Sequence, residues 1–192
     1  MARTPSQMLP LGTPAPVFNL PDPDGKMHSL DSAAGSRAYL VMFICNHCPF
    51  VKHVADELAR LGRDYADQGA AIFAINSNDV ENYPDDGPDA MRQESAARGY
   101  TFPYLLDADQ SVAQAYEAAC TPDFYLFDSD RKLVYRGQLD GSRPGNDVPA
   151  DGRDLRAALD AVLAGDPVAE DQVPSLGCNI KWKPGNEPSY FG

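Results

Sequence analysis

Two stretches of the chain are continuously apolar, and the segment between them repeats its apolar residues with the period of a helix. Residues 38–44 (AYLVMFI) and 71–75 (AIFAI) are typical of strands that are covered on both faces. In the intervening segment, apolar side chains recur at alternating spacings of three and four, which predicts a helix with one buried stripe: Val51, Val54, Leu58, Leu61 and Tyr65. Gly69 follows this stripe and is expected to end the helix.

The rest of the chain continues the alternation of short apolar runs and amphipathic segments. A hairpin is expected over residues 17–30, around a turn at Asp24-Gly25. Further strands are predicted at 104–106, 124–127 and 133–135, and further helices at 89–98, 112–119 and 155–163. This order predicts an α/β fold: a central mixed sheet flanked by helices, with an N-terminal hairpin extension and an irregular C-terminal tail.

Length and composition indicate one folded domain. The chain has 192 residues, of which 43% are hydrophobic, and this is enough for a sizeable core. We expect residues 1–165 to form the domain and residues 166–192 to form an arm packed on it. A net charge of −12 disfavours nucleic acids and anionic membranes as partners. Because no segment has the length and apolarity of a signal-peptide core or a membrane span, we expect a cytoplasmic protein.

The candidate chemistry lies in a C-x-x-C motif, Cys45-Asn-His-Cys48, between the first apolar run and the predicted helix. Unpaired N–H groups and the dipole at a helix N-terminus stabilise an anion, so a cysteine at that place is expected to be acidic and nucleophilic. His47 adds a positive charge beside the pair, and Pro49 suits the first helical turn because it lacks an N–H. We therefore expect an exposed, activated dithiol.

Other interpretations of the motif compete with this one. Both cysteines could be small core residues, but a C-x-x-C spacing at a strand-to-helix junction favours redox chemistry. Zinc needs two further ligands, usually a second close pair, and Cys120 and Cys178 are isolated in the sequence. Copper(I) capture by the pair together with His47 or His53 is chemically reasonable but unspecific. We expect no bound metal and no cofactor.

Thr121 and Pro122 open the apolar run at 124–127, and together with the C-x-x-C motif they resemble the thioredoxin superfamily. Three further segments are similar to its redoxin/AhpC-TSA branch, in particular to a peroxiredoxin-like group with a CxxC motif: residues 15–26 (APVFNLPDPDGK), 75–79 (INSND) and 177–182 (GCNIKW). The resemblance covers nearly the whole chain. It implies a thioredoxin-like fold in which Thr121 and a cis Pro122 form the wall opposite Cys45.

The resemblance also implies a thiol-disulfide oxidoreductase. Cys45 would be the attacking thiol and Cys48 the resolving one, acting on a protein or small-molecule disulfide with an unidentified thiol as electron donor. One alternative is a thiol peroxidase in which Cys48 is oxidised by peroxide and Cys45 resolves it. Peroxiredoxins usually have a hydroxyl residue at the position of Cys45 and a proline at that of Val41, so no identified group would polarise the peroxide bond. Another alternative is a metal-binding or redox-sensing module that uses the same pair.

The remaining cysteines and the longest polar stretch have structural interpretations. Cys120 is expected either to fill the corner before the proline or to act as an auxiliary cysteine. A disulfide between Cys120 and Cys178 is a hypothesis. Trp182 is expected to anchor the tail and to find a partner for its indole N–H. The polar stretch 76–89 lacks the spacing of a calcium loop and is expected to form solvated turns.

Overall fold

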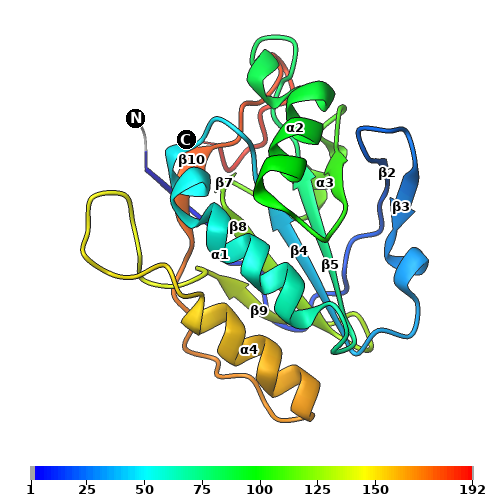
Figure 1. The fold of residues 1–192 in the computed structure, drawn as a ribbon, viewed down its shortest axis with the longest axis vertical. Coiled ribbons are helices and arrows are strands. Elements are labelled where there is room, and N and C mark those ends of the chain that lie inside the picture. Colours follow the sequence, from blue (N-terminus) through cyan, green and yellow to red (C-terminus); the bar gives the residue numbers. More distant parts are fainter. Residues whose placement is uncertain (1–2, 192) are drawn as a thin grey trace.

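A five-stranded mixed sheet forms the centre of the molecule (Figure 1). The computed structural model describes residues 3–191. From one edge of the sheet to the other, the strands are β6 (Tyr104–Leu106), β5 (Ala70–Asn76), β4 (Ala38–Phe43), β8 (Asp123–Asp128) and β9 (Leu133–Gly137). β4, β5 and β6 run parallel, whereas β8 runs antiparallel to β4, and β9 runs antiparallel to β8. The predicted thioredoxin-like α/β fold is thereby confirmed.

Helices cover both faces of this sheet. α1 (Pro49–Tyr65), α2 (Pro88–Arg98) and α4 (Arg153–Ala164) pack on one face, and α3 (Ser111–Ala115) packs on the other. Side chains along β4 alternate between the two faces, and all of them are buried. This two-sided burial explains why the strand is apolar throughout. No helix among residues 3–191 is long and apolar enough to cross a bilayer.

α1 begins where the change of hydrophobic period predicts it. Cys48 is its N-cap residue, in an extended backbone conformation, and Pro49 is its first helical residue. The predicted stripe is buried against the sheet: Val51, Val54, Leu58, Leu61 and Tyr65. Each such side chain contributes about 1.5–3 kcal/mol when it is fully buried. The stripe therefore holds the N-terminus of α1 firmly at the end of β4.

Two smaller sheets flank the central one. β2 (Asn19–Pro21) and β3 (Met27–Ser29) form the predicted N-terminal hairpin, which is followed by a short 3₁₀ helix, η1 (Leu30–Ala33). The other small sheet contains β1 (Thr4–Pro5), β10 (Leu176–Asn179) and β7 (Cys120–Thr121), in this order. A second 3₁₀ helix, η2 (Pro84–Asp86), precedes α2.

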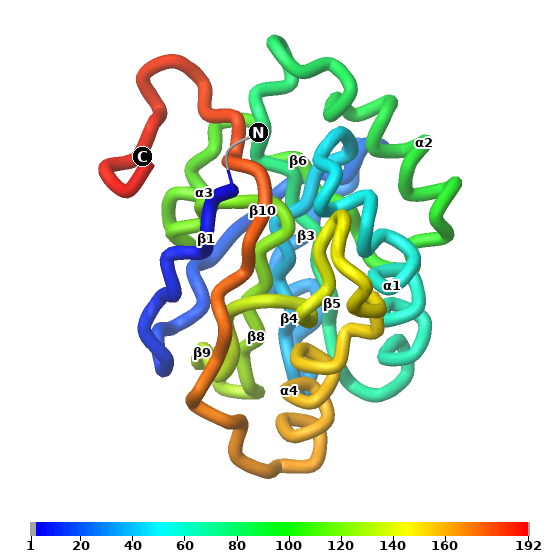
Figure 2. Tube along the Cα trace, turned by 90° about the vertical axis from the view of Figure 1, so that its left-hand side faces the viewer, coloured from blue at the N-terminus to red at the C-terminus, as the bar shows by residue number. Residues whose placement is uncertain are grey.

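The C-terminal tail is more ordered than the sequence predicts. Its strand β10 lies between β1 and β7, and Figure 2 shows it running beside the N-terminal strand. In this register Cys178 lies opposite Thr121, and Asn179 lies opposite Cys120. The tail therefore reaches the segment just before Pro122. The division of the chain into a domain and an arm at residue 165 stays a prediction.

Gly177 allows β10 to come this close. A Cβ atom at this position would overlap the backbone carbonyl of Thr121, and would also press on the amide nitrogen of Pro122. Since both obstacles are backbone atoms, they cannot move aside as a flexible side chain would. Only a residue without a side chain fits between β10 and β7.

Gly177→Ala is expected to push β10 away from β7 and to lower the free energy of unfolding by about 1–3 kcal/mol, the usual cost of overpacking. Denaturant unfolding measures this change. Gly141→Ala is the matched control, since its Cβ would meet nothing nearer than a Val148 methyl group at 3.9 Å. That control is expected to change stability by less than about 0.5 kcal/mol. Equal effects of the two substitutions would contradict the close approach.

Candidate active site

Cys45 and Cys48 lie where the carboxyl end of β4 meets the N-terminus of α1. Cys45 is 2% exposed and Cys48 is 0% exposed, so the expectation of an exposed dithiol is wrong. The reason is the tail and the loop before β8, which cover the junction of β4 and α1.

Several hydrogen-bond partners surround the Cys48 sulfur. The Sγ atom of Cys178 lies 2.9 Å from it, and the Cys45 thiol also bonds to it. The backbone N–H of Val51, in the first turn of α1, points at it as well. Led by the Cys178 contact, these bonds lower the pKa of Cys48 well below its usual range. Cys45 and Cys178 show the opposite shift, because the hydrogen bond that each makes with Cys48, together with burial, raises the pKa of both thiols.

The wall opposite the dithiol is the segment that the resemblance implies. The Thr121–Pro122 peptide bond is cis. The Oγ1 atom of Thr121 lies 3.4 Å from the Cys45 sulfur, and its carbonyl oxygen lies 3.2 Å from the Cys48 sulfur. Thr121 therefore contacts both sulfurs, and the structure brings it together with the C-x-x-C motif as expected.

Asp86, which belongs to the polar stretch 76–89 and was expected in a solvated turn, instead holds the two residues inside the motif. Its carboxylate accepts hydrogen bonds from the backbone N–H groups of Asn46, at 2.8 Å, and His47, at 3.2 Å. The His47 ring nitrogen Nδ1 lies 2.5 Å from the same carboxylate, and Asn78 donates to it at 2.8 Å. A fully buried carboxylate with this many donors fixes the conformation of the motif.

This network shifts two pKa values. The hydrogen bond to Asp86 raises the pKa of His47, which favours the charged imidazolium beside the dithiol. Burial alone would raise the pKa of Asp86, but the hydrogen bonds from His47 and Asn78 outweigh burial and lower it. Within the stretch expected to form solvated turns, residues 76–79 and Asp86 are buried and support the motif, whereas residues 81–85 and 88–89 are exposed as expected. An acidic residue in a polar segment gives no local sign of such burial, so only the fold reveals it.

Cys120 fills the corner before Pro122. It is 0% exposed, and its sulfur lies 3.7 Å from the Pro122 carbonyl oxygen. Burial raises its pKa well above the usual range, which makes it a poor nucleophile. In the described residues Cys178 lies against Cys48, and no disulfide joins it to Cys120.

Asp123 and Tyr125 are buried near the site and bond to each other, a pairing that the sequence does not predict. Asp123 pairs with Phe43 across the sheet, and burial raises the pKa of its carboxyl group to about 8. Tyr125 donates a hydrogen bond to one carboxylate oxygen of Asp123, whereas the other oxygen of Asp123 has no partner among the described residues.

Trp182 is buried in the tail, as expected. Its indole N–H has no hydrogen-bond partner among the described residues, so the expectation of such a partner is wrong.

A metal ion would have one candidate cluster among the described residues, made of Cys45, His47 and Asp86. The side chains of His47 and Asp86 already bond to each other, and Asp86 has two backbone donors to satisfy. Metal binding would break these bonds, so the arrangement favours a redox role over metal capture.

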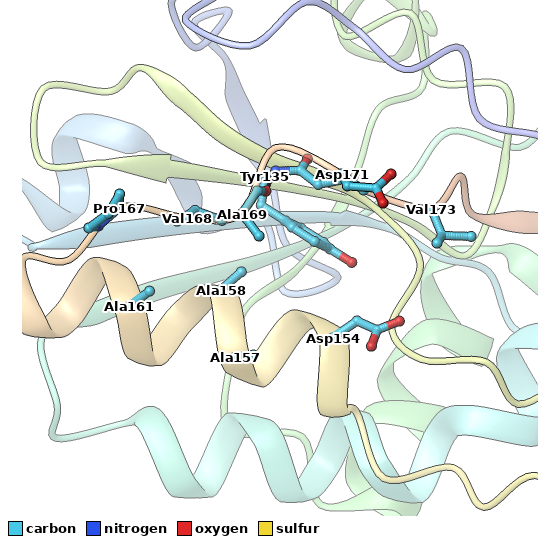
Figure 3. Close-up of a pocket in the computed structure, with 11 residues that line it drawn as sticks. Tyr135, Asp154, Ala157, Ala158, Ala161, Pro167, Val168, Ala169, Asp171 and Val173 are labelled. Carbon is cyan, nitrogen blue, oxygen red and sulfur yellow. Dashed lines mark hydrogen bonds between the residues drawn. The ribbon is translucent and has the colours of Figure 1, made fainter.

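A cavity lies away from the dithiol, between α4, β9 and residues 167–173 (Figure 3). Its volume is about 340 Å³, and its walls are mostly alanine, valine and proline side chains with Asp154, Asp171 and Tyr135. No cysteine or histidine lines it. The chemistry of the chain is therefore concentrated at the β4–α1 junction.

Most of the chain matches a known protein family. Residues 11–136 match the AhpC/TSA family, a range that contains the C-x-x-C motif and Pro122 but ends before Cys178. The chain is 28% identical over 123 residues to "Thiol-disulfide oxidoreductase ResA" of Bacillus subtilis (strain 168), and the match covers 64% of each chain. This chain thus spans less than two thirds of the length of that relative.

Two crystal structures are similar to nearly the whole chain. An uncharacterized conserved protein from Geobacillus kaustophilus is 56% identical, with a TM-score of 0.94, and the match covers 96% of this chain and 98% of that one. A hypothetical protein from Sinorhizobium meliloti 1021 is 53% identical, with a TM-score of 0.94, and the match covers 95% of this chain and 100% of that one.

Asp86→Asn is expected to lower the pKa of His47 towards its ordinary value, because the neutral amide no longer stabilises the imidazolium. An NMR titration of the imidazole measures the shift. Asp85→Asn is the matched control: Asp85 is exposed, and only its backbone carbonyl bonds to the motif, through Asn46. An unchanged His47 pKa in Asp86→Asn would contradict the pairing.

The same substitution has a predicted pH dependence. The raised pKa of His47 gives stability that is present at low pH and is lost as pH rises through the folded pKa. The lowered pKa of Asp86 gives stability that is present at higher pH and is lost as pH falls through its folded pKa. The difference in unfolding free energy between wild type and Asp86→Asn is therefore expected to be largest between about pH 4 and 6.5.

Proposed function

The chain belongs to the AhpC/TSA family, and from this premise we propose that it is a thiol-disulfide oxidoreductase in which Cys45 and Cys48 cycle between dithiol and disulfide. The chain is an oxidoreductase of the thiol-disulfide or peroxiredoxin-like kind. The observation that carries the finer proposal is the convergence of thiol and backbone donors on the Cys48 sulfur at the N-cap of α1. This arrangement supplies a thiolate at neutral pH with a second thiol bonded to it.

The proposed reaction uses the hydrogen bond between the two cysteines. The Cys45 thiol passes its proton to the Cys48 thiolate, and the resulting Cys45 thiolate attacks one sulfur of the substrate disulfide. The substrate S–S bond breaks, one substrate thiolate leaves, and a mixed disulfide forms on Cys45. Cys48 gives its proton to the leaving thiolate and attacks the Cys45 sulfur. The second substrate thiolate leaves, and a Cys45–Cys48 disulfide remains for an external thiol to reduce.

The neighbouring residues have supporting roles in this proposal. Thr121 contacts the Cys45 sulfur and, with Pro122, forms the wall against which a substrate disulfide would lie. His47 places a positive charge beside the pair, and Asp86 keeps it there. The substrate would be a protein or small-molecule disulfide and the electron donor a thiol. A cytoplasmic location, where glutathione and thioredoxin keep thiols reduced, also stays part of the proposal.

A thiol peroxidase is the second candidate, and the lowered pKa of Cys48 favours it. In that reaction the Cys48 thiolate attacks a peroxide oxygen, the O–O bond breaks, and a sulfenic acid forms. Cys45 then attacks the sulfenic sulfur, closes the disulfide and releases water. The complete burial of Cys48, and a residue other than proline at Val41, favour the oxidoreductase instead.

Cys45→Ser and Cys48→Ser are each expected to reduce dithiol-dependent insulin reduction at least about a hundredfold, because neither variant can close the Cys45–Cys48 disulfide. Cys120→Ser is the control, since it removes a buried thiol that bonds to neither sulfur of the pair in the structure. Full activity of Cys45→Ser would contradict the proposal. Stopped-flow peroxide consumption that is fast in wild type and lost in Cys48→Ser would favour the peroxidase.

His47→Ala is expected to lower the reduction potential of the Cys45/Cys48 couple, because the imidazolium stabilises the thiolate of the reduced form. A loss of 1.4 kcal/mol of this stabilisation corresponds to about 30 mV. Equilibration with a glutathione buffer measures the potential. His28→Ala is the matched control, because His28 also pairs with an aspartate, Asp22 at 2.9 Å, but lies in the β2–β3 hairpin. An unchanged or higher potential in His47→Ala would remove this role.

A further inference from the structure

We propose that Cys178 is a third redox-active cysteine, which exchanges with the Cys45–Cys48 disulfide to form a Cys48–Cys178 disulfide. This inference rests on the proposed function of the C-x-x-C pair. It assigns a reaction to a residue of the tail that lies outside the range matched by the family.

The two sulfurs are already close to bonding distance. The Sγ atoms of Cys48 and Cys178 are 2.9 Å apart, and a disulfide bond is about 2 Å long. An approach of less than about 1 Å is therefore enough to join them. Cys48 thus has two thiol neighbours, Cys45 on the same loop and Cys178 on the tail, and can bond to one of them at a time.

The position of Cys178 is held from both sides along the chain. On one side, Gly177 lets β10 pack directly against the Thr121 backbone, with Cys178 opposite Thr121. On the other side, the backbone N–H of Lys181 donates a hydrogen bond to the Asn78 side-chain oxygen at 2.8 Å, which fixes the chain after Cys178. Asn78 also donates to Asp86, which holds the C-x-x-C loop. One amide side chain therefore connects the tail to the loop that carries the other two cysteines.

Of the three cysteines that meet at the site, Cys178 has the most exposed side chain. It is 5% exposed, against 2% for Cys45 and 0% for Cys48. It lines a cavity of about 260 Å³, together with Tyr83, Lys181 and Trp182. An exchange from Cys45–Cys48 to Cys48–Cys178 would move the disulfide from the covered motif to the wall of this cavity. An external thiol could reach it there.

The exchange changes no oxidation state. The Cys178 thiol loses its proton, and the thiolate attacks the Cys48 sulfur of the Cys45–Cys48 disulfide. The Cys48–Cys178 bond forms, the Cys45–Cys48 bond breaks, and Cys45 leaves as a thiolate that takes up a proton. Cys45 is then a thiol again, and the oxidation is held in the Cys48–Cys178 disulfide, which an external thiol reduces to return Cys48 and Cys178 to thiols.

Tryptic mapping after limited oxidation tests this directly. One equivalent of diamide is added to the full chain, the thiols are blocked at low pH, and the peptides are analysed without reduction. Cys45 and Cys48 share the tryptic peptide 38–52, whereas Cys178 lies in 157–181 and Cys120 in 99–131. A Cys45–Cys48 disulfide therefore stays within one peptide, and a Cys48–Cys178 disulfide joins two.

Wild type is expected to give both products, and Cys45→Ser to give only the 38–52/157–181 pair. Cys178→Ser is expected to lose that pair completely and to keep the internal disulfide, and Cys120→Ser, the control, is expected to keep both. Absence of the joined pair from wild type or from Cys45→Ser would overturn the inference and leave the proposed function intact. Absence of the internal disulfide from Cys178→Ser would overturn the proposed function, and the inference with it.

Discussion

The site depends on one electrostatic constraint: the Cys48 sulfur at the N-terminus of α1 lies against two other thiols and the Val51 N–H group, which together lower its pKa. A buried thiolate is costly unless donors replace the lost water. Cys48 receives such donors from two other thiols and from the first turn of the helix. The pKa of Cys48 is lowered and the pKa values of Cys45 and Cys178 are raised, so ionisation of one sulfur disfavours ionisation of the other two.

Three segments that are distant in sequence must meet to satisfy this constraint. The motif lies between β4 and α1, Thr121 lies in β7 and is followed by Pro122, and the tail supplies Cys178 through β10. Asp86 adds the fourth element by fixing the backbone of the motif. The tail is thus part of the site, because its Cys178 contacts the same Cys48 sulfur as Cys45 does.

The sequence predicted what depends on local pattern and missed what depends on long-range contact. The apolar run of β4, the stripe of α1 and the meeting of Thr121 with the motif all follow from periodicity or from a family resemblance. Asp86 lies some forty positions from the motif that it supports, and Cys178 lies 130 positions from Cys48. Contacts between residues so far apart in the sequence leave no periodic pattern of apolar and polar positions from which they could be predicted. β10 is too short to show alternation, and the burial of the dithiol comes from segments that cover it only after folding.

The central claim is that Cys48 is the ionised thiol of the site, and the ultraviolet absorbance of thiolate as a function of pH tests it most directly. Wild type is expected to show one thiol that titrates well below the ordinary cysteine pKa of about 8.5, and this component should be missing from Cys48→Ser. Titration of every thiol at or above that value, or an acidic component that persists in Cys48→Ser, would contradict the account.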